Sequence, residues 1–76
     1  MRELFVIRGL YDTIDLVSHA LEVDGDVIVQ HGNVSLDGKS LEDMMKLMTN
    51  DALLIEFPAE AKEFSEYLRK TFYKPE

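Results

Sequence analysis

The spacing of apolar residues along the chain alternates between a strand-like and a helix-like pattern. Short runs rich in β-branched and aromatic residues predict four strands. Between and after them, apolar residues recur every three or four positions, which predicts three amphipathic helices. The predicted strands cover 4–7, 27–30, 34–37 and 53–57, and the predicted helices run from about Asp12 to a turn at 24–26, from Ser40 to about Asn50, and from about Ala59 to Phe72.

Turn-forming residues separate these elements. Gly32 and Asn33 join the two middle strands in a hairpin, because both residues tolerate a positive φ. Pro58 ends the last strand, and Asp12 or Thr13 is expected to cap the first helix. The resulting order, β-α-β-β-α-β-α, predicts an α/β (α+β) fold. We expect a two-layer open-faced sandwich, in which three helices cover one face of a largely antiparallel four-stranded sheet.

Each predicted helix carries its apolar residues on one side, which we expect to face the sheet. The stripes are Ile14, Val17 and Leu21, widened by Leu16 and Ala20, in the first helix; Leu41, Met44, Met45 and Met48 in the second; and Ala61, Phe64, Leu68 and Phe72 in the third.

The composition indicates one domain, 1–76, in a reducing compartment. The 76 residues include no cysteine, so the chain forms no disulfide and no Cys-based zinc site, and a cytoplasmic location is expected. The net charge of -7 and the scattered Lys and Arg residues argue against a nucleic-acid surface and disfavour anionic membranes. The apolar stretch near the amino terminus is too short for a signal peptide or a membrane span. We therefore expect neither a nucleic-acid nor a membrane partner.

Ser40 lies where the second helix is expected to begin. In the pattern Ser40-x-x-Asp43, the hydroxyl can accept a hydrogen bond from the third helical N–H while the carboxylate reaches back. The same end of a helix also favours a phosphate, because of its unpaired N–H groups and the helix dipole. Ser40 is therefore interpreted either as a helix cap, the commoner role for this pattern, or as a phosphorylation site.

From the glycine turn at 24–26 through the hairpin, the Lys39-Ser40 pair and the Met-rich helix, the chain resembles HPr, the histidine phosphocarrier of the bacterial sugar phosphotransferase system. The resemblance covers nearly the whole chain and implies the same open-faced sandwich. Lys39-Ser40 falls where the family has a Lys-Ser pair at the start of its second helix. In many Gram-positive members a dedicated kinase phosphorylates that serine, so the resemblance makes Ser40 a candidate regulatory phosphosite. Glu42 and Asp43 depart from the family and would oppose a phosphate there.

The loop after the first strand departs from the family's catalytic motif. The family has Gly-Leu-His or Gly-Ile-His followed by a small residue, arginine and proline, whereas the 9–12 loop here is Gly9-Leu10-Tyr11-Asp12. Tyr11 stands in for the histidine, and a tyrosine, with a reference pKa of about 10, is a poor nucleophile without activation. The arginine that would balance the phosphate is missing, and Asp12 adds repulsion. We expect no enzymatic phosphotransfer at this degenerate site, and we expect the Tyr11 ring to pack half-buried at the start of the helix.

In the family, the start of the second helix also forms an apolar docking surface for partner proteins. The resemblance therefore implies that Leu41 and Met45 are exposed, while Met44 and Met48 face the core. Taken alone, methionines at this spacing are interpreted as core residues. The candidate docking residues are Lys39, Leu41 and Met45.

Two histidines lie outside the degenerate loop. His19 is predicted in the middle of the first helix, and His31 at the hairpin tip, at the far end of the fold from the 9–12 loop. Neither has an arginine beside it in the sequence. They form no zinc signature, and the carboxylates form no calcium loop, so we expect no metal and no cofactor.

These patterns favour a non-catalytic interaction or regulatory protein with an HPr-like fold. Its expected partner is a protein, such as a phosphotransferase-system component, a transcription factor or a metabolic enzyme, bound through the Ser40 helix and the neighbouring 9–12 loop. One alternative is a working phosphotransferase component whose phosphate acceptor is His19 or His31. Another is an unrelated small α/β ligand-binding domain, for example a ferredoxin-like domain with an extra terminal helix, which would differ in strand order.

Overall fold

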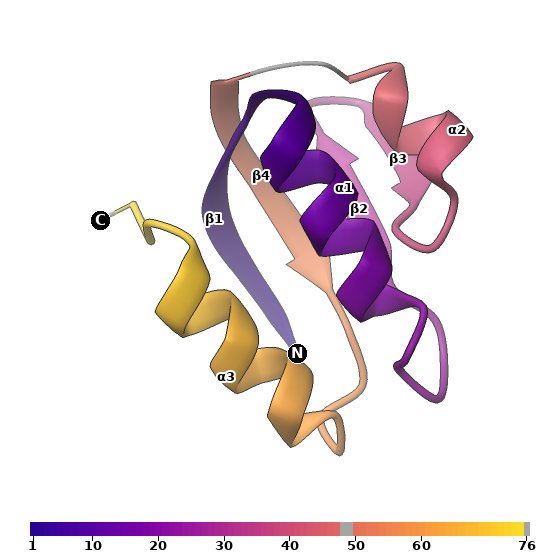
Figure 1. Ribbon diagram of the computed structural model, residues 1–76, viewed down its shortest axis with the longest axis vertical. Helices are drawn as coiled ribbons and strands as arrows, with labels where there is room; N and C mark the ends of the chain where they lie inside the picture. Colours follow the sequence, from indigo (N-terminus) through magenta and orange to yellow (C-terminus); the bar gives the residue numbers. More distant parts are fainter. Residues whose placement is uncertain (48–49, 76) are drawn as a thin grey trace.

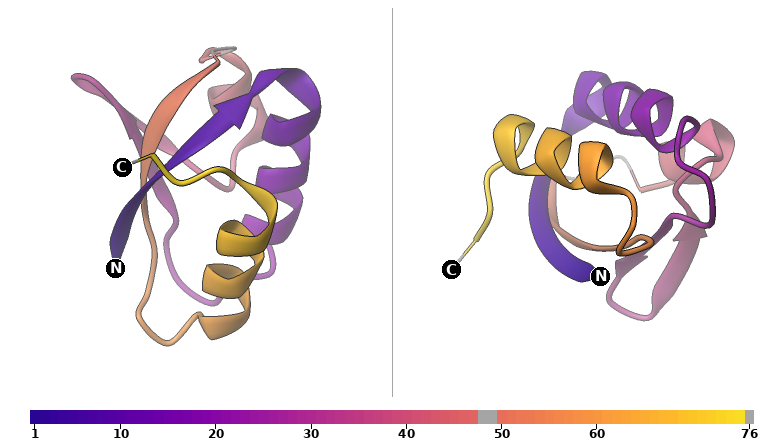
Figure 2. Two further views of the ribbon diagram at one scale, coloured as in Figure 1. Left: turned by 90° about the vertical axis from the view of Figure 1, so that its left-hand side faces the viewer. Right: turned by 90° about the horizontal axis from the view of Figure 1, so that it is seen from below.

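The computed structural model, which describes residues 1–47 and 50–75, is a sheet with helices on one face (Figure 1). Its elements are β1 (Arg2–Arg8), α1 (Gly9–Ala20), β2 (Ile28–His31), β3 (Val34–Asp37), α2 (Leu41–Met45), β4 (Asn50–Glu56) and α3 (Lys62–Thr71). All strand pairs are antiparallel. Figure 2 shows the three helices side by side above the sheet, with α1 between α2 and α3. The predicted fold class and order of elements are confirmed.

The strand order is β1-β4-β2-β3, so the last strand lies inside the sheet. β4 pairs along its whole length with β1, from Glu56 opposite Arg2 to Asn50 opposite Arg8. Its other edge pairs with β2, where Ile28 lies opposite Glu56. A ferredoxin-like sheet places the first strand between the third and the fourth. The strand order therefore separates this fold from the ferredoxin-like arrangement.

The core lies between the helices and the covered face of the sheet. Side chains alternate along each strand, so that Phe5 and Ile7 of β1 are buried under the helices while Leu4 is exposed on the open face. The largest fully buried side chains are Phe5, Ile7, Leu16, Val27, Val29, Met44, Leu53, Ile55 and Leu68.

The first helix begins earlier than the sequence predicted. Gly9, with a φ of +71°, turns the chain directly from β1 into α1, a conformation that glycine adopts without a steric penalty. The prediction of a cap at Asp12 or Thr13 is therefore wrong. The Asp12 carboxylate instead accepts a hydrogen bond from the Arg8 N–H at 2.9 Å, and the Thr13 hydroxyl donates to the Gly9 carbonyl at 2.8 Å.

The buried side of α1 is also displaced from the predicted stripe. Leu16, Val17 and Ala20 are buried as expected, but Ile14 and Leu21 are exposed. Thr13 takes a core position instead. A threonine can be buried there because its hydroxyl donates a hydrogen bond to a backbone carbonyl one turn earlier. The positions of the apolar residues alone therefore do not show which side of this helix faces the sheet.

The other two helices are shorter than predicted. α2 ends at Met45, and β4 begins at Asn50, so the prediction that Asn50 follows the helix as a left-handed cap is wrong. Met48, predicted to face the core, lies outside the described residues. α3 buries Phe64 and Leu68 as predicted.

The segment after α3 is fastened to β1, which is an edge strand. The Val6 N–H donates to the Tyr73 carbonyl at 2.8 Å. The Glu3 carboxylate, whose side chain is only 10% exposed, accepts hydrogen bonds from Arg69 at 2.6 Å and Lys74 at 2.8 Å. Both bonds hold the pKa of Glu3 below its ordinary value, and the bond from Lys74 has the larger effect. The carboxyl-terminal segment thereby covers part of an otherwise open sheet edge.

Glu3→Gln should lower the free energy of unfolding by about 1–2 kcal/mol, because it weakens two charge-assisted hydrogen bonds. Since folding lowers the pKa of Glu3, the ionised carboxylate stabilises the fold. This stabilisation is fully present at a pH above the ordinary pKa of 4.5 and is lost as the pH falls through the lowered pKa. Urea denaturation at about pH 7 and about pH 3 measures this difference. The control is Glu56→Gln, which removes an exposed contact with Arg2 at 3.4 Å and should cost less than about 0.5 kcal/mol. Equal losses in the two variants would contradict the anchoring role of Glu3.

Candidate functional site

The degenerate 9–12 loop forms the first turn of α1 and presents Tyr11 to solvent. The Tyr11 side chain is 86% exposed. The prediction that its ring packs half-buried is therefore wrong. With 3.6 residues per helical turn, Tyr11 lies roughly opposite Thr13, and Thr13 is the residue of this turn that faces the sheet.

Ser40 caps α2, as predicted. Its Oγ accepts a hydrogen bond from the Asp43 N–H at 3.2 Å. The predicted return contact, in which the Asp43 carboxylate reaches back to Ser40, is absent between these two described residues. The Ser40 N–H donates instead to the Asp37 carbonyl at 3.0 Å. The Asp43 carboxylate lies 3.7 Å from the Lys46 ammonium. The Ser40 hydroxyl is thus a structural acceptor in this fold.

Lys39 holds the start of α2 against the far end of α1. Its ammonium donates to the Val23 carbonyl at 2.6 Å, just beyond α1. α1 has 12 residues and is therefore about 18 Å long. Because α2 runs back along α1 (Figure 1), Ser40 and Tyr11 lie near opposite ends of α1. The Ser40 helix packs beside α1, whose first turn is the 9–12 loop, with Ser40 itself toward the other end of α1.

The outer side of α2 is apolar. Leu41 is 42% exposed and Met45 is 38% exposed, whereas Met44 is buried at 1%. This is the orientation that the resemblance implies, whereas the prediction from the apolar stripe, that all three side chains face the sheet, is wrong for Leu41 and Met45. Their role in docking stays a prediction.

His19 lies in the contact between α1 and α3. Its ring stacks on Tyr67, with ring centroids 3.6 Å apart and planes 9° from parallel. Nδ1 lies 2.9 Å from the Asp15 carbonyl oxygen, and because a carbonyl can only accept, Nδ1 carries the proton in this contact. The Tyr67 hydroxyl donates to the Asp15 carboxylate at 2.6 Å. The pKa of Tyr67 is raised above its ordinary value, mainly because the side chain is partly buried and secondly because of this bond to Asp15.

His31 and Asp51 form a pair at the end of the sheet where α1 begins. His31 Nε2 lies 3.0 Å from the Asp51 carboxylate, and the bond lowers the pKa of that carboxyl. Asp51 pairs with Ile7, and Ile7 is two residues before Gly9. The hairpin tip and the start of α1 therefore lie at the same end of the sheet. The prediction that His31 lies at the far end is wrong, because β4 inserts between β1 and β2 and brings the ends of both strands together.

Exposed apolar side chains also follow one side of α1. Leu10, Ile14 and Leu21 recur four and seven positions apart, which aligns them along the helix. They lie on the side of α1 away from α3, since Asp15 and His19, which contact α3, are on the opposite side. This side therefore adjoins α2. We define the α1–α2 surface by its five exposed apolar side chains, Leu10, Ile14, Leu21, Leu41 and Met45.

The histidine contacts were absent from the sequence predictions for different reasons. Asp15 and His19 are four residues apart on a helix, a spacing that signals a side-by-side pair. Tyr67 joins them only because α3 packs on α1. The pair of His31 with Asp51 depends on strand pairing, for which the sequence carries no local signal.

The described part of the chain contains no group of three or more His, Asp or Glu side chains arranged to hold a metal ion. The helices within residues 1–47 and 50–75 are all too short or too polar to cross a membrane.

Ser40→Ala should lower the free energy of unfolding by about 1 kcal/mol, because the Asp43 N–H loses its acceptor. Ser35→Ala, at an exposed position of β3, is the matched control and should change stability by less than about 0.5 kcal/mol. Chemical denaturation measures both. An unchanged midpoint for Ser40→Ala would refute the capping role.

Comparisons with protein-family models, with curated proteins and with solved structures gave no match. The resemblance to HPr thus rests on the sequence features given above, chiefly the order of elements and the Lys39-Ser40 pair.

Proposed function

We propose that this chain is a protein-interaction module that docks a partner protein through the α1–α2 surface and does not carry a phosphoryl group on histidine. The observation that carries the proposal is the exposure of five large apolar side chains on α1, its C-cap residue and the neighbouring α2, above a core of buried side chains. Single exposed apolar residues are ordinary, but a contiguous group marks an interaction site.

Tyr11 adds an aromatic anchor beside this surface. It is the most exposed of the large apolar and aromatic side chains in the described residues, and it follows Leu10 directly. Tyrosine combines a large contact area with a polar hydroxyl, and aromatic residues of this kind are enriched among the strongest contributors to protein interfaces. The position that the HPr family uses for phosphate is, in this proposal, a contact residue.

The charge around the surface restricts the partner. Glu42 and Asp43 lie on α2 beside Leu41, and the whole chain has a net charge of -7. A partner whose apolar patch is bordered by lysine and arginine would meet this edge favourably and would be steered toward it. We therefore propose a partner with a basic rim.

The surroundings of both histidines disfavour the carrier alternative. His19 is stacked on Tyr67, and its Nδ1 is bonded to the Asp15 carbonyl. The Nε2 atom of His31 lies 3.0 Å from the Asp51 carboxylate, which would repel a phosphoryl group attached there.

The contacts of Ser40 also disfavour a phosphorylation switch. Its hydroxyl accepts from the Asp43 N–H, and the ammonium of Lys39 donates to the Val23 carbonyl. A phosphate on Ser40 would meet the carboxylates of Glu42 and Asp43, and this repulsion opposes the attraction of the helix N-terminus for a phosphate. Ser40 is a structural residue in this proposal.

Incubation with phosphoenolpyruvate and the general phosphotransferase enzyme should leave the intact mass of the chain unchanged. The reason is that Tyr11 replaces the reactive histidine and both remaining histidines lie beside acceptor groups. An active HPr in the same reaction is the positive control. An acid-labile gain of one phosphate would contradict the proposal, and its loss in His19→Ala or His31→Ala would identify the acceptor.

Photo-crosslinking tests the docking surface directly. A photoreactive p-benzoylphenylalanine at position 41 should give a discrete protein adduct in extract of the source cells, and Met45→Asp should abolish it. The same group at position 4 is the control, because Leu4 is 44% exposed, close to the value for Leu41, but lies on the open face of the sheet.

The captured protein, once purified, should bind Met45→Asp at least about tenfold more weakly than the unaltered chain, a loss of about 1.4 kcal/mol. It should bind Leu4→Asp as it binds the unaltered chain. Equal crosslinking from position 4, or an equal loss of affinity in Leu4→Asp, would show that the partner uses another face. Circular dichroism establishes that the variants are folded.

A further inference from the structure

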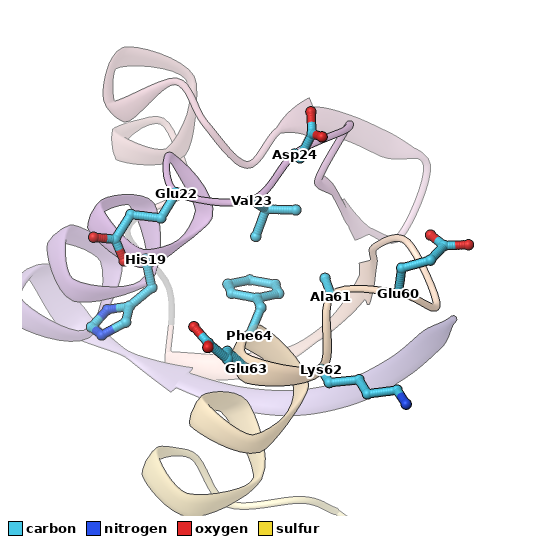
Figure 3. Close-up of a pocket in the computed structure, with 9 residues that line it drawn as sticks. All are labelled: His19, Glu22, Val23, Asp24, Glu60, Ala61, Lys62, Glu63 and Phe64. Carbon is cyan, nitrogen blue, oxygen red and sulfur yellow. The ribbon is translucent and has the colours of Figure 1, made fainter.

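A cleft of about 750 Å³ opens between the end of α1 and the start of α3 (Figure 3). It lies on the α3 side of α1, separate from the α1–α2 surface. Its volume falls within the range typical of small-molecule sites, roughly 300–1,000 Å³.

The floor of the cleft is apolar and largely buried, with Phe64 5% exposed and Val23 8% exposed. Figure 3 shows the Phe64 ring in the middle of the cleft, with Val23 and Ala61 around it. The Phe64 ring packs edge to face on Phe57, with centroids 5.5 Å apart, which fixes its orientation. An apolar ligand would meet a surface that is already formed.

The two loops that frame the cleft are also held in place. The loop after α1 is anchored by the bond from Lys39 to the Val23 carbonyl. Gly25, with a φ of +122°, packs so closely on Pro58 that an added Cβ would lie 2.8 Å from the proline ring. On the side of the cleft formed by α1, the His19 ring is held in place because it stacks on Tyr67.

The rim of the cleft is strongly negative. It carries four carboxylates, those of Glu22, Asp24, Glu60 and Glu63, against the single ammonium of Lys62. In Figure 3, Glu22 and Glu63 lie on the same side of the cleft as His19, while the side chains of Asp24, Glu60 and Lys62 extend away from its middle. The end of α1 and the start of α3 contribute dipoles of opposite sign, so the side chains decide the sign of the potential.

We propose that this cleft binds a small organic cation, an amine that is protonated at neutral pH and attached to an apolar body. The ammonium group lies at the Glu22 and Glu63 side, and the apolar body covers Phe64. His19 lines the same side of the cleft. Anionic ligands such as sugar phosphates and nucleotides are repelled by the same carboxylates.

The test is an amide NMR titration of the full chain with phenethylammonium. Two controls share its apolar body, 2-phenylethanol, which is neutral, and phenylacetate, which is an anion. Phenethylammonium should give saturable shifts at the amides of Val23, Glu63 and Phe64, and it should bind at least about tenfold more tightly than the alcohol. Phenylacetate should give none, and added salt should weaken the binding of the cation. Equal binding of phenylacetate, or shifts spread away from the cleft, would overturn the proposal.

Charge-removing variants locate the cation. Glu22→Gln combined with Glu63→Gln should weaken phenethylammonium binding at least about fivefold. Glu66→Gln is the matched control, because Glu66 is exposed on α3 outside the lining of the cleft. All three positions are exposed, so the variants should fold, and dispersed amide spectra verify this. An equal effect of Glu66→Gln would mean that only the overall charge matters. Tighter binding of a lysine-rich peptide than of the free amine would contradict a small-molecule ligand.

Discussion

The pairing of β4 with both β1 and β2 is the constraint on which the rest of the structure depends. Because β4 is antiparallel to each of its neighbours, β1 and β2 run in the same direction on either side of it. The chain can join them only by crossing over the sheet, and α1 makes this crossing. α1 therefore lies in the middle of the helical layer, with α2 on one side and α3 on the other (Figure 2).

This central place gives α1 two different sides and separates two surfaces. Toward α2, the apolar residues of α1 are left exposed and adjoin those of α2, which suits a protein partner. Toward α3, Asp15 and His19 bond and stack against Tyr67, and the cleft beyond them is acidic. An apolar protein surface and a cationic ligand would therefore be recognised on opposite sides of the same helix.

The order of the elements was predictable from the sequence, because each element carries its own periodicity and its own turn signals. The Gly32-Asn33 hairpin and the Ser40 cap are local features of this kind, and both appear in the structure. The strand order was not predictable, since it depends on long-range pairing. For that reason the sequence misplaced His31 at the far end of the fold.

Errors at α1 have a local physical cause. A buried threonine with a satisfied hydroxyl replaces Ile14 on the core side, and this rotation of the helix also turns Tyr11 outward. For Met44 and Met45, in contrast, the side-chain chemistry gives no local signal. Nothing in their own chemistry distinguishes two adjacent methionines, and only the resemblance to HPr indicated which of them faces the core.

Hydroxyl-radical footprinting tests the central claim most directly, because the chain contains its own reference residues. In the free chain, Met1, Met45 and Tyr11 should be oxidised and Met44 should be spared, as their exposures require. With the partner bound, oxidation of Met45 and Tyr11 should fall severalfold while that of Met1 stays the same. Protection of Met1 as strong as that of Met45, or no protection of Met45, would contradict docking through the α1–α2 surface.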